Sequence, residues 1–188
     1  NDVWEDRPEE DLTEIFYLDE KYCGRSAADK VDDVRKALKE KGACAIVVNK
    51  LDNIAWLFNI RANDVAYNPV AVAYAYIDEK NAVFYTAKKR LPKEVEERLN
   101  KNGVTVREYD EIFADIAAVS EKSNVLCDTS ELNGKLYEVV CENKNLTPVN
   151  AADPIFLLKA RKNETETANT FTAYLKDGCA LAEFYSWI

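Results

Sequence analysis

The chain has 188 residues, and none of them is histidine or methionine. Without an imidazole, the chain has no base for a Ser-His-Asp or Cys-His nucleophile and no histidine ligand for zinc. This absence excludes most hydrolytic chemistry from the residues present. Because even the first residue is not methionine, we expect the sequence to be an excerpt of a longer protein.

Glycine and cysteine are also scarce, with five of each, and neither set forms a motif. The glycines occur singly, so no Gly-rich loop is present to bind the phosphates of a nucleotide cofactor. The cysteines are widely spaced and include no CxxC pair, which argues against a disulfide framework and a zinc cluster. We therefore expect buried, reduced thiols at Cys23, Cys44, Cys127, Cys141 and Cys179.

Long apolar runs and an excess of positive charge are missing as well. No apolar stretch approaches the roughly 20 residues needed to cross a bilayer, and the initial NDVWEDRPEED is acidic where a signal peptide is basic and then apolar. The net charge is −9, from 25 basic and 34 acidic residues, so the mean field of the protein repels a phosphate backbone. We expect a soluble, cytoplasmic protein that binds neither nucleic acid nor membrane.

The abundant carboxylates predict no metal site. Most of them fall on helix faces together with Lys and Arg, which is typical of solvated ion-pair surfaces. Four others have the oxygen ligands that Mg²⁺ or Mn²⁺ prefers, although their spacing matches no known metal-binding loop: Asp19, Glu20, Asp52 and Asp128. We therefore assign no metal ligand to this chain.

What the sequence does contain is an alternation of helical and strand-like segments. Ser26 followed by Asp29 predicts a helix start, and Gly42 predicts its end. Asp52 is expected to cap the next helix, and 70–77 is expected to be a buried strand at the centre of the sheet. Strands are predicted at 43–48, 70–77, 82–86, 104–107, 124–127 and 146–149, and helices at 27–41, 54–58, 92–99, 112–119 and 132–140. The rhythm predicts an α/β fold with a mixed, roughly six-stranded sheet flanked by helices.

From residue 154 onward the pattern is purely helical. A short helix is predicted at 155–160 and a long one from 163 to 188. On the long helix, an apolar stripe consists of Ala168, Phe171, Leu175, Cys179 and Ala182. This tail is expected to belong to a different layer.

One polar loop has the character of a binding segment. It comprises residues 59–69 and lies between a buried helix ending at Phe58 and a buried strand starting at Val70. Loops fixed at both ends by core elements are favourable places for binding residues. The alternative is a purely structural connection, in which Arg61 pairs with Asp64 and Asn68 caps backbone groups.

At this loop the sequence resembles a known family. The string DNIAWLFNIRANDVAYNPV is similar to the DEIAWLxNxRGxDxxxNPVF stretch of cytosolic-type Xaa-Pro aminopeptidases, the long three-domain form of the creatinase-like metallopeptidases. VWEDRPEE resembles the start of the second domain of that family, and YCGRSAADKVDDVRKAL resembles its first helix. ARKNETETANTFTAYLKDGCALAEFYSWI resembles the first helix of its catalytic domain.

The resemblance implies a division of the chain and a parent enzyme. Residues 1–24 would be a lead-in, 25–153 a creatinase-type N-terminal domain, and 154–188 a helical linker with the first helix of the catalytic domain. The parent would remove the N-terminal residue of peptides whose second residue is proline, using two divalent cations, usually manganese, to activate a hydroxide. The family's metal ligands are two Asp, one His and two Glu beyond the present chain. This fragment is therefore expected to hold no cofactor and no catalytic residue.

The resemblance also implies site residues and partners. Arg61, Asp64 and Asn68 occupy positions of the family loop that faces the catalytic cleft, whereas Tyr67 falls at a variable position. The implied partners are the missing catalytic domain, peptide substrates and a second copy of the chain in a homo-oligomer. Two departures predict a changed cleft: Ala62 stands where the family has Gly, and Ala71 stands where it has Phe.

Two other functions remain open from the sequence. One is a catalytically inactive creatinase-fold module for protein interaction. The other is the matching domain of a prolidase or a creatinase-like C–N hydrolase. Trp56 is interpreted as a core residue, with substrate stacking as the alternative.

Overall fold

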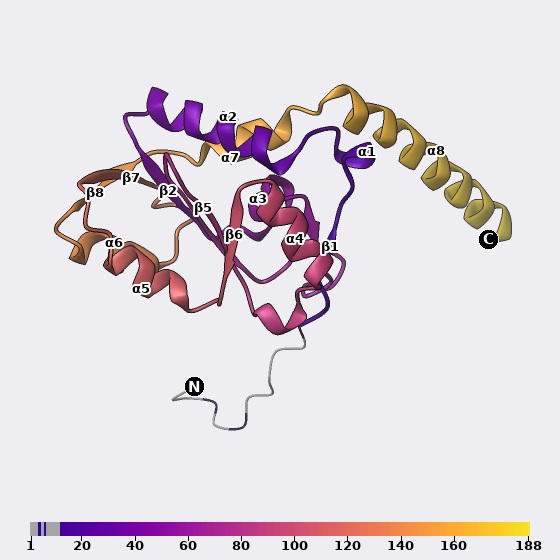
Figure 1. Ribbon diagram of the computed structural model, residues 1–188. Coiled ribbons are helices and arrows are strands. Elements are labelled where there is room, and N and C mark those ends of the chain that lie inside the picture. Colours follow the sequence, from indigo (N-terminus) through magenta and orange to yellow (C-terminus); the bar gives the residue numbers. More distant parts are fainter. Residues whose placement is uncertain (1–3, 5, 7–11) are drawn as a thin grey trace.

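A mixed sheet forms the centre of the computed structural model, which describes residues 4, 6 and 12–188 (Figure 1). In this part of the chain, six strands lie in the order β6 (Val104–Arg107), β5 (Ala82–Tyr85), β4 (Tyr74–Ile77), β2 (Ala45–Val48), β7 (Ser123–Cys127) and β8 (Leu146–Asn150). The β2–β4 and β4–β5 pairs are antiparallel, and the β2–β7, β5–β6 and β7–β8 pairs are parallel. The predicted mixed, six-stranded α/β fold is confirmed.

Helices cover both faces of this sheet and enclose two apolar clusters. On one face lie α2 (Ala27–Glu40), α3 (Leu51–Leu57), α4 (Lys93–Lys101) and α7 (Pro154–Ala160). On the other face lie α5 (Glu111–Ala117) and α6 (Gly134–Glu142), at the lower left of Figure 1. Strands β4 and β2 lie at the centre of the sheet, and the central position of β4 agrees with the expectation for the apolar run at 70–77.

Local sequence signals account for the most regular helix. The Ser26 hydroxyl accepts a hydrogen bond from Asp29 N at the start of α2, and Gly42, with a φ of 70°, follows its end. Val31, Val34 and Leu38 line its buried face. The prediction for this helix is confirmed.

Two predicted elements differ from the structure. Helix α3 begins at Leu51 after Lys50, and Asp52 lies within its first turn, where its carboxylate pairs with Lys159 instead of capping the helix. The strand expected at 70–77 begins at Tyr74, because Val72 N donates to the Asp64 carboxylate rather than to a neighbouring strand. A side-chain partner outside the predicted element decides each case: Lys159 pairs with Asp52, and the Asp64 carboxylate accepts from Val72 N.

A small second sheet escaped prediction. Strand β1 (Phe16–Tyr17) pairs antiparallel with β3 (Ile60–Arg61), within the segment expected to be a loop. Ile15, just before β1, is fully buried in the core, and so is Ile155 of α7. The apolar core therefore includes residues on both sides of 25–153. Residues 1–3, 5 and 7–11 of the expected lead-in lie outside the described residues.

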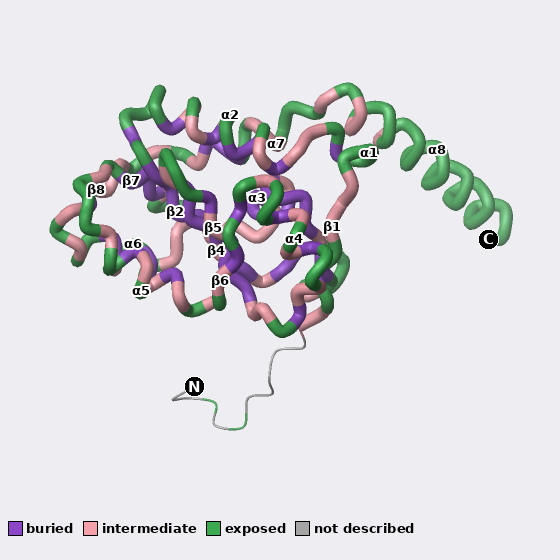
Figure 2. The backbone as a smooth tube through the Cα atoms, viewed as in Figure 1, coloured by how far each residue is buried: buried purple, intermediate pink, exposed green. Residues whose placement is uncertain are grey.

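The chain ends in the long helix α8 (Glu164–Trp187), which projects from the body of the molecule (Figures 1 and 2). Every residue from Phe171 to Ile188 is exposed, including Phe171 at 74% and Trp187 at 82%. A short helix, α1 (Glu20–Cys23), lies against its first turns. No helix in the described part of the chain is long and apolar enough to span a membrane.

The cysteines agree with expectation in part. All five thiols are free, but Cys23 and Cys127 are buried whereas Cys44, Cys141 and Cys179 are exposed. Burial raises the pKa of Cys127 to about 11, so this thiol is unreactive at neutral pH.

Candidate functional site

The segment from Asn59 to Val70 combines a buried base with an exposed tip. Asn59 follows α3 with a φ of 55°, a left-handed conformation that asparagine tolerates better than most residues. Its side chain is buried, donates from Nδ2 to Arg25 O at 2.8 Å and accepts at Oδ1 from Lys30 Nζ at 2.7 Å. These bonds hold the sharp turn that directs the chain into β3.

Arg61 turns back toward α3. Its guanidinium donates to Ala55 O and to Ile60 O, each at 2.8 Å. Burial lowers the pKa of Arg61, while negative charge from Cys23 and Glu166 acts against that shift. The Arg61–Asp64 ion pair of the alternative, purely structural interpretation does not form, because the carbonyl oxygen near the end of α3 takes the guanidinium.

Asp64 instead joins four segments of the chain. Its Oδ1 accepts from Thr13 N and Thr13 Oγ1, both at 3.0 Å, and its Oδ2 accepts from Val72 N at 2.6 Å. The same oxygen pairs with Arg90 of the 3₁₀ helix η1 (Lys88–Arg90). Burial acts to raise the pKa of Asp64, but the hydrogen bonds from Val72, Arg90 and Thr13 hold it below its usual value.

The tip of the loop is open to solvent. Val65 and Asn68 form an isolated β-bridge, and Asn68 N donates to Val65 O at 3.1 Å. Tyr67, between them, has a φ of 64° and a fully exposed ring. Arg61 and Asp64 thus fix the base of the loop, whereas Tyr67 and Asn68 present side chains that can contact a ligand.

The two departures from the family pattern fit the backbone of this chain. The left-handed non-glycine residues in its described part are Asn59 and Tyr67, so Ala62 needs no glycine conformation. Ala62 and Ala71 are both buried in the core. Neither residue therefore lies in the exposed tip.

Trp56 lies between the core and α8. It packs against the core cluster, and Lys30 Nζ lies 4.4 Å from its ring centroid. Its indole Nε1 donates to Glu166 Oε1 at 3.3 Å. The structure supports the interpretation of Trp56 as a packing residue.

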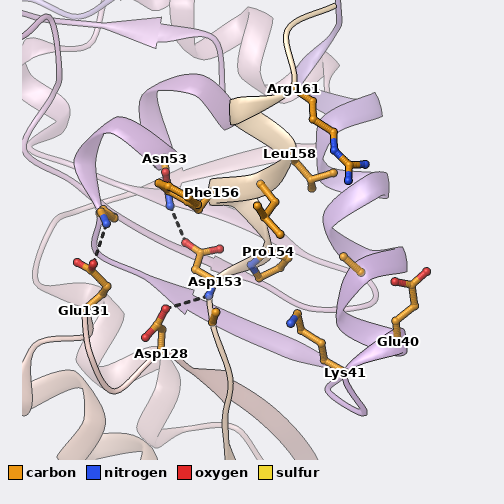
Figure 3. Close-up of a pocket in the computed structure, with 14 residues that line it drawn as sticks. Glu40, Lys41, Asn53, Asp128, Glu131, Asp153, Pro154, Phe156, Leu158 and Arg161 are labelled. Atoms are coloured by element: carbon orange, nitrogen blue, oxygen red, sulfur yellow. Dashed lines mark hydrogen bonds and ion pairs between the residues drawn. The ribbon is translucent and has the colours of Figure 1, made fainter.

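A hollow of about 580 Å³ opens at the carboxyl ends of β2, β7 and β8, away from this loop (Figure 3). Asp153 joins the polar residues on one wall of this hollow. The Asp153 backbone N donates to Asp128 Oδ2 at 3.0 Å, and Asp153 Oδ2 accepts from Asn53 Nδ2 at 2.7 Å. Burial raises the pKa of Asp153. Pro154 and Phe156 of α7 form an apolar wall. Asp128 was considered from the sequence as a metal ligand, but this cavity was not predicted. Strand order could have indicated it, because the carboxyl ends of parallel strands gather at one edge of a sheet.

The four carboxylates weighed as metal ligands do not come together. Asp19 caps α1 and lies 3.4 Å from Arg98, Asp52 pairs with Lys159, and Asp128 accepts from Ser130 Oγ at 2.5 Å. Within the described residues, no group of three or more His, Cys, Asp or Glu side chains is placed to hold a metal ion.

The fold agrees with the family comparison. The profile of the Creatinase/Prolidase N-terminal domain matches residues 6–166, and the chain belongs to this family. A protein of Sordaria macrospora named Probable Xaa-Pro aminopeptidase P is 36% identical over 196 residues, covering 99% of this chain and 32% of the relative. Aminopeptidase P1 of Lotus japonicus is 30% identical over 226 residues, covering 100% of this chain and 34% of the relative. The chain thus spans about a third of the length of these relatives.

Solved structures give the same picture. The X-prolyl aminopeptidase of Caenorhabditis elegans, described as a cytosolic enzyme with a di-nuclear active site, has a TM-score of 0.88 at 27% identity. That similarity covers 99% of this chain and 31% of the enzyme. An Xaa-Pro dipeptidase from Bacillus anthracis has a TM-score of 0.62 at 16% identity, over 87% of this chain and 44% of that chain, and shows the shared fold alone.

Proposed function

We propose that this chain is the non-catalytic creatinase-type domain of an Xaa-Pro aminopeptidase, a cytoplasmic enzyme that removes the residue preceding proline from the N-terminus of peptides. The observation that carries the proposal is similarity along the whole chain, including α8, to proteins with that name. The domain would limit access to the catalytic cleft and contribute to subunit packing.

The loop supplies the part of this role that belongs to the chain itself. We place Arg61, Asp64 and Asn68 in the cleft-facing loop, with different tasks. Arg61 and Asp64 hold the base through buried hydrogen bonds, and Asn68 and Tyr67 contact the peptide from the exposed tip. A rigid base with exposed contact groups positions a substrate at a small entropic cost.

The metal chemistry lies elsewhere in the proposed parent. Two divalent cations, with manganese as the expected metal, would supply an activated hydroxide. Their ligands would follow the exposed helix α8, whose apolar side chains would pack against the catalytic domain.

The test is an assay of the full-length protein with Mn²⁺ on matched peptides that carry proline or alanine at the second position. Release of the first residue from the proline peptide alone is expected. Equal cleavage of both peptides, or activity restricted to dipeptides, would refute the aminopeptidase assignment in favour of another C–N hydrolase.

Loop variants of the same protein test the role of the domain. Arg61→Ala should lower kcat/KM by about tenfold, since a displaced loop misplaces the substrate, while the metal content stays unchanged. Tyr67→Ala and Asn68→Ala should raise KM, whereas the control Tyr137→Ala, on the exposed face of α6, should not. Unchanged kinetics in all loop variants would return the loop to a structural role.

A further inference from the structure

Helix α8 meets the rest of the molecule through its first two turns. Asn163 and Glu166 form a capping box there: Glu166 N donates to Asn163 Oδ1, and Asn163 N donates to Glu166 Oε2, each at 2.9 Å. From Phe171 onward the helix is exposed. The contacts of these two turns therefore decide the direction in which the helix leaves the domain.

The same turns bind the end of α1. Asn163 Nδ2 donates to Cys23 O at 2.8 Å, and Asn169 Nδ2 donates to Tyr22 O at 3.0 Å. These carbonyl groups belong to the last turn of α1, which offers them no partner within the helix. Asn163 thus caps α8 with one side-chain atom and holds α1 with the other.

Gly24 makes this approach possible. It ends α1 with a φ of 73°, and a Cβ at this position would lie 2.6 Å from Asn163 Oδ1 and 2.8 Å from Thr165 Cβ. Gly103 has the same φ of 73° but has no atom within 4 Å of an added Cβ. Glycine at position 24 therefore meets a packing requirement in addition to a conformational one.

Glu166 adds an electrostatic contact with the core. Its Oε1 accepts from Trp56 Nε1 at 3.3 Å. Beneath the indole, Lys30 Nζ donates to Trp56 O at 2.9 Å, and the Glu166 charge favours the protonated forms of both Lys30 and Arg61. Because these two cations are buried, a nearby carboxylate stabilises their charged forms.

We propose that Gly24, Asn163, Glu166 and Trp56 form a latch that fixes the direction of α8 relative to the sheet domain. Its members are positioning residues: they act through the helix and touch no reacting atom. If the proposed function holds, this latch also sets the position of the catalytic domain relative to the loop at 59–69 in the parent enzyme. This consequence rests on the proposed function.

Helix direction can be measured in the 188-residue chain by double electron–electron resonance between nitroxide side chains introduced at the exposed positions Glu94 and Ala168. The latched chain should give one narrow distance distribution. Gly24→Ala should broaden or shift it, whereas Gly103→Ala, which carries the same backbone strain without the clash, should leave it unchanged. Equal distributions in the two variants would overturn the proposal.

A second pair of variants guards against misfolding. Asn163→Ser keeps a good helix cap but removes the donor to Cys23 O, so it should broaden the distribution in a folded protein. Glu166→Gln removes the charge and leaves a single oxygen to accept from either Trp56 Nε1 or Asn163 N. It should therefore broaden the distribution less than Asn163→Ser and lower the pKa of Lys30 below about 8, as followed by the ¹⁵N chemical shift of its Nζ. An unmoved Lys30 pKa would exclude the electrostatic contact.

The latch and the proposed function fail separately. The distance measurements need no activity, so a full-length protein without Xaa-Pro cleavage would remove the proposed function and leave the latch standing. If that protein is active, Gly24→Ala should lower its kcat/KM with its metal content intact, and Gly103→Ala should not.

Discussion

The Asp64 carboxylate and the Arg90 guanidinium pair in the interior, where their side chains are 1% and 4% exposed. Arg90 also donates to Val72 O at 2.7 Å and to Thr86 Oγ1 at 2.8 Å. Both charges are satisfied by several partners, which is the condition under which a buried ion pair is tolerated. This pair connects the candidate loop to the residues just before β4 and just after β5, through Val72 and Thr86.

Removing one member of this pair should destabilise the domain strongly. Asp64→Ala leaves Arg90 buried without its carboxylate and should lower the free energy of unfolding by about 3–5 kcal/mol. In the control Asp32→Ala, the lost partner of Arg35 is 62% exposed, and the change should stay below about 1 kcal/mol. Urea denaturation measures both, and similar losses in the two variants would contradict the prediction.

Stability should rise with pH through the titration of Lys30. Burial lowers the pKa of Lys30 from 10.5 to about 8, so between these pH values the unfolded state binds more protons than the folded state. The free-energy cost of burying the protonated Lys30 side chain is fully present below pH 8 and is relieved as the pH rises toward 10. Relative to Lys30→Met, the wild type should gain about 2 kcal/mol between pH 7 and pH 10.

The measurement is the difference in unfolding free energy between the wild type and Lys30→Met at each pH, which cancels the titration of tyrosines and thiols. Lys36→Met is a suitable control, because the Lys36 side chain is 74% exposed. A difference that does not change with pH would show that Lys30 titrates normally.

Helix α8 should be the least protected helix of the isolated chain. Amides of residues 171–188 should exchange quickly in a dilute sample, since no side chain there is buried. Protection should increase with protein concentration if the exposed apolar side chains associate. Amides of α2, which buries Val34 and Leu38, serve as the internal reference. Slow exchange of 171–188 in a dilute monomer would be inconsistent with this view.

The isolated chain should release no amino acid from Xaa-Pro peptides in the presence of Mn²⁺, Co²⁺ or Zn²⁺. The chain contains no histidine, and no carboxylate cluster in its described part is placed to hold two metals and activate water. Chromatographic detection of the free amino acid, together with calorimetric titration of Mn²⁺, checks both points. Amino-acid release that increases in proportion to the concentration of the chain would disprove the prediction of inactivity.

The sequence predicted those features that depend on neighbouring residues. The ends of α2 followed from Ser26 and Gly42 because caps act within one helical turn. Strand β1 could not be predicted, since two residues become a strand only through pairing with β3 more than 40 positions away. For the same reason the alternative interpretation of the loop paired Asp64 with the wrong arginine: Arg61 is closer in sequence, but Arg90 lies beside Asp64 in space.

The mixed pairing of β2 determines the order in which the chain can fold during synthesis. Its β4 edge is paired soon after translation, whereas its other edge waits for β7, since Ala45 lies opposite Val125. Until β7 has been synthesised, the nascent chain exposes the apolar strand AIVV with unpaired backbone groups along one edge. Polypeptides released before Cys127 should therefore aggregate through this edge, and chaperones that bind extended apolar segments should recognise it.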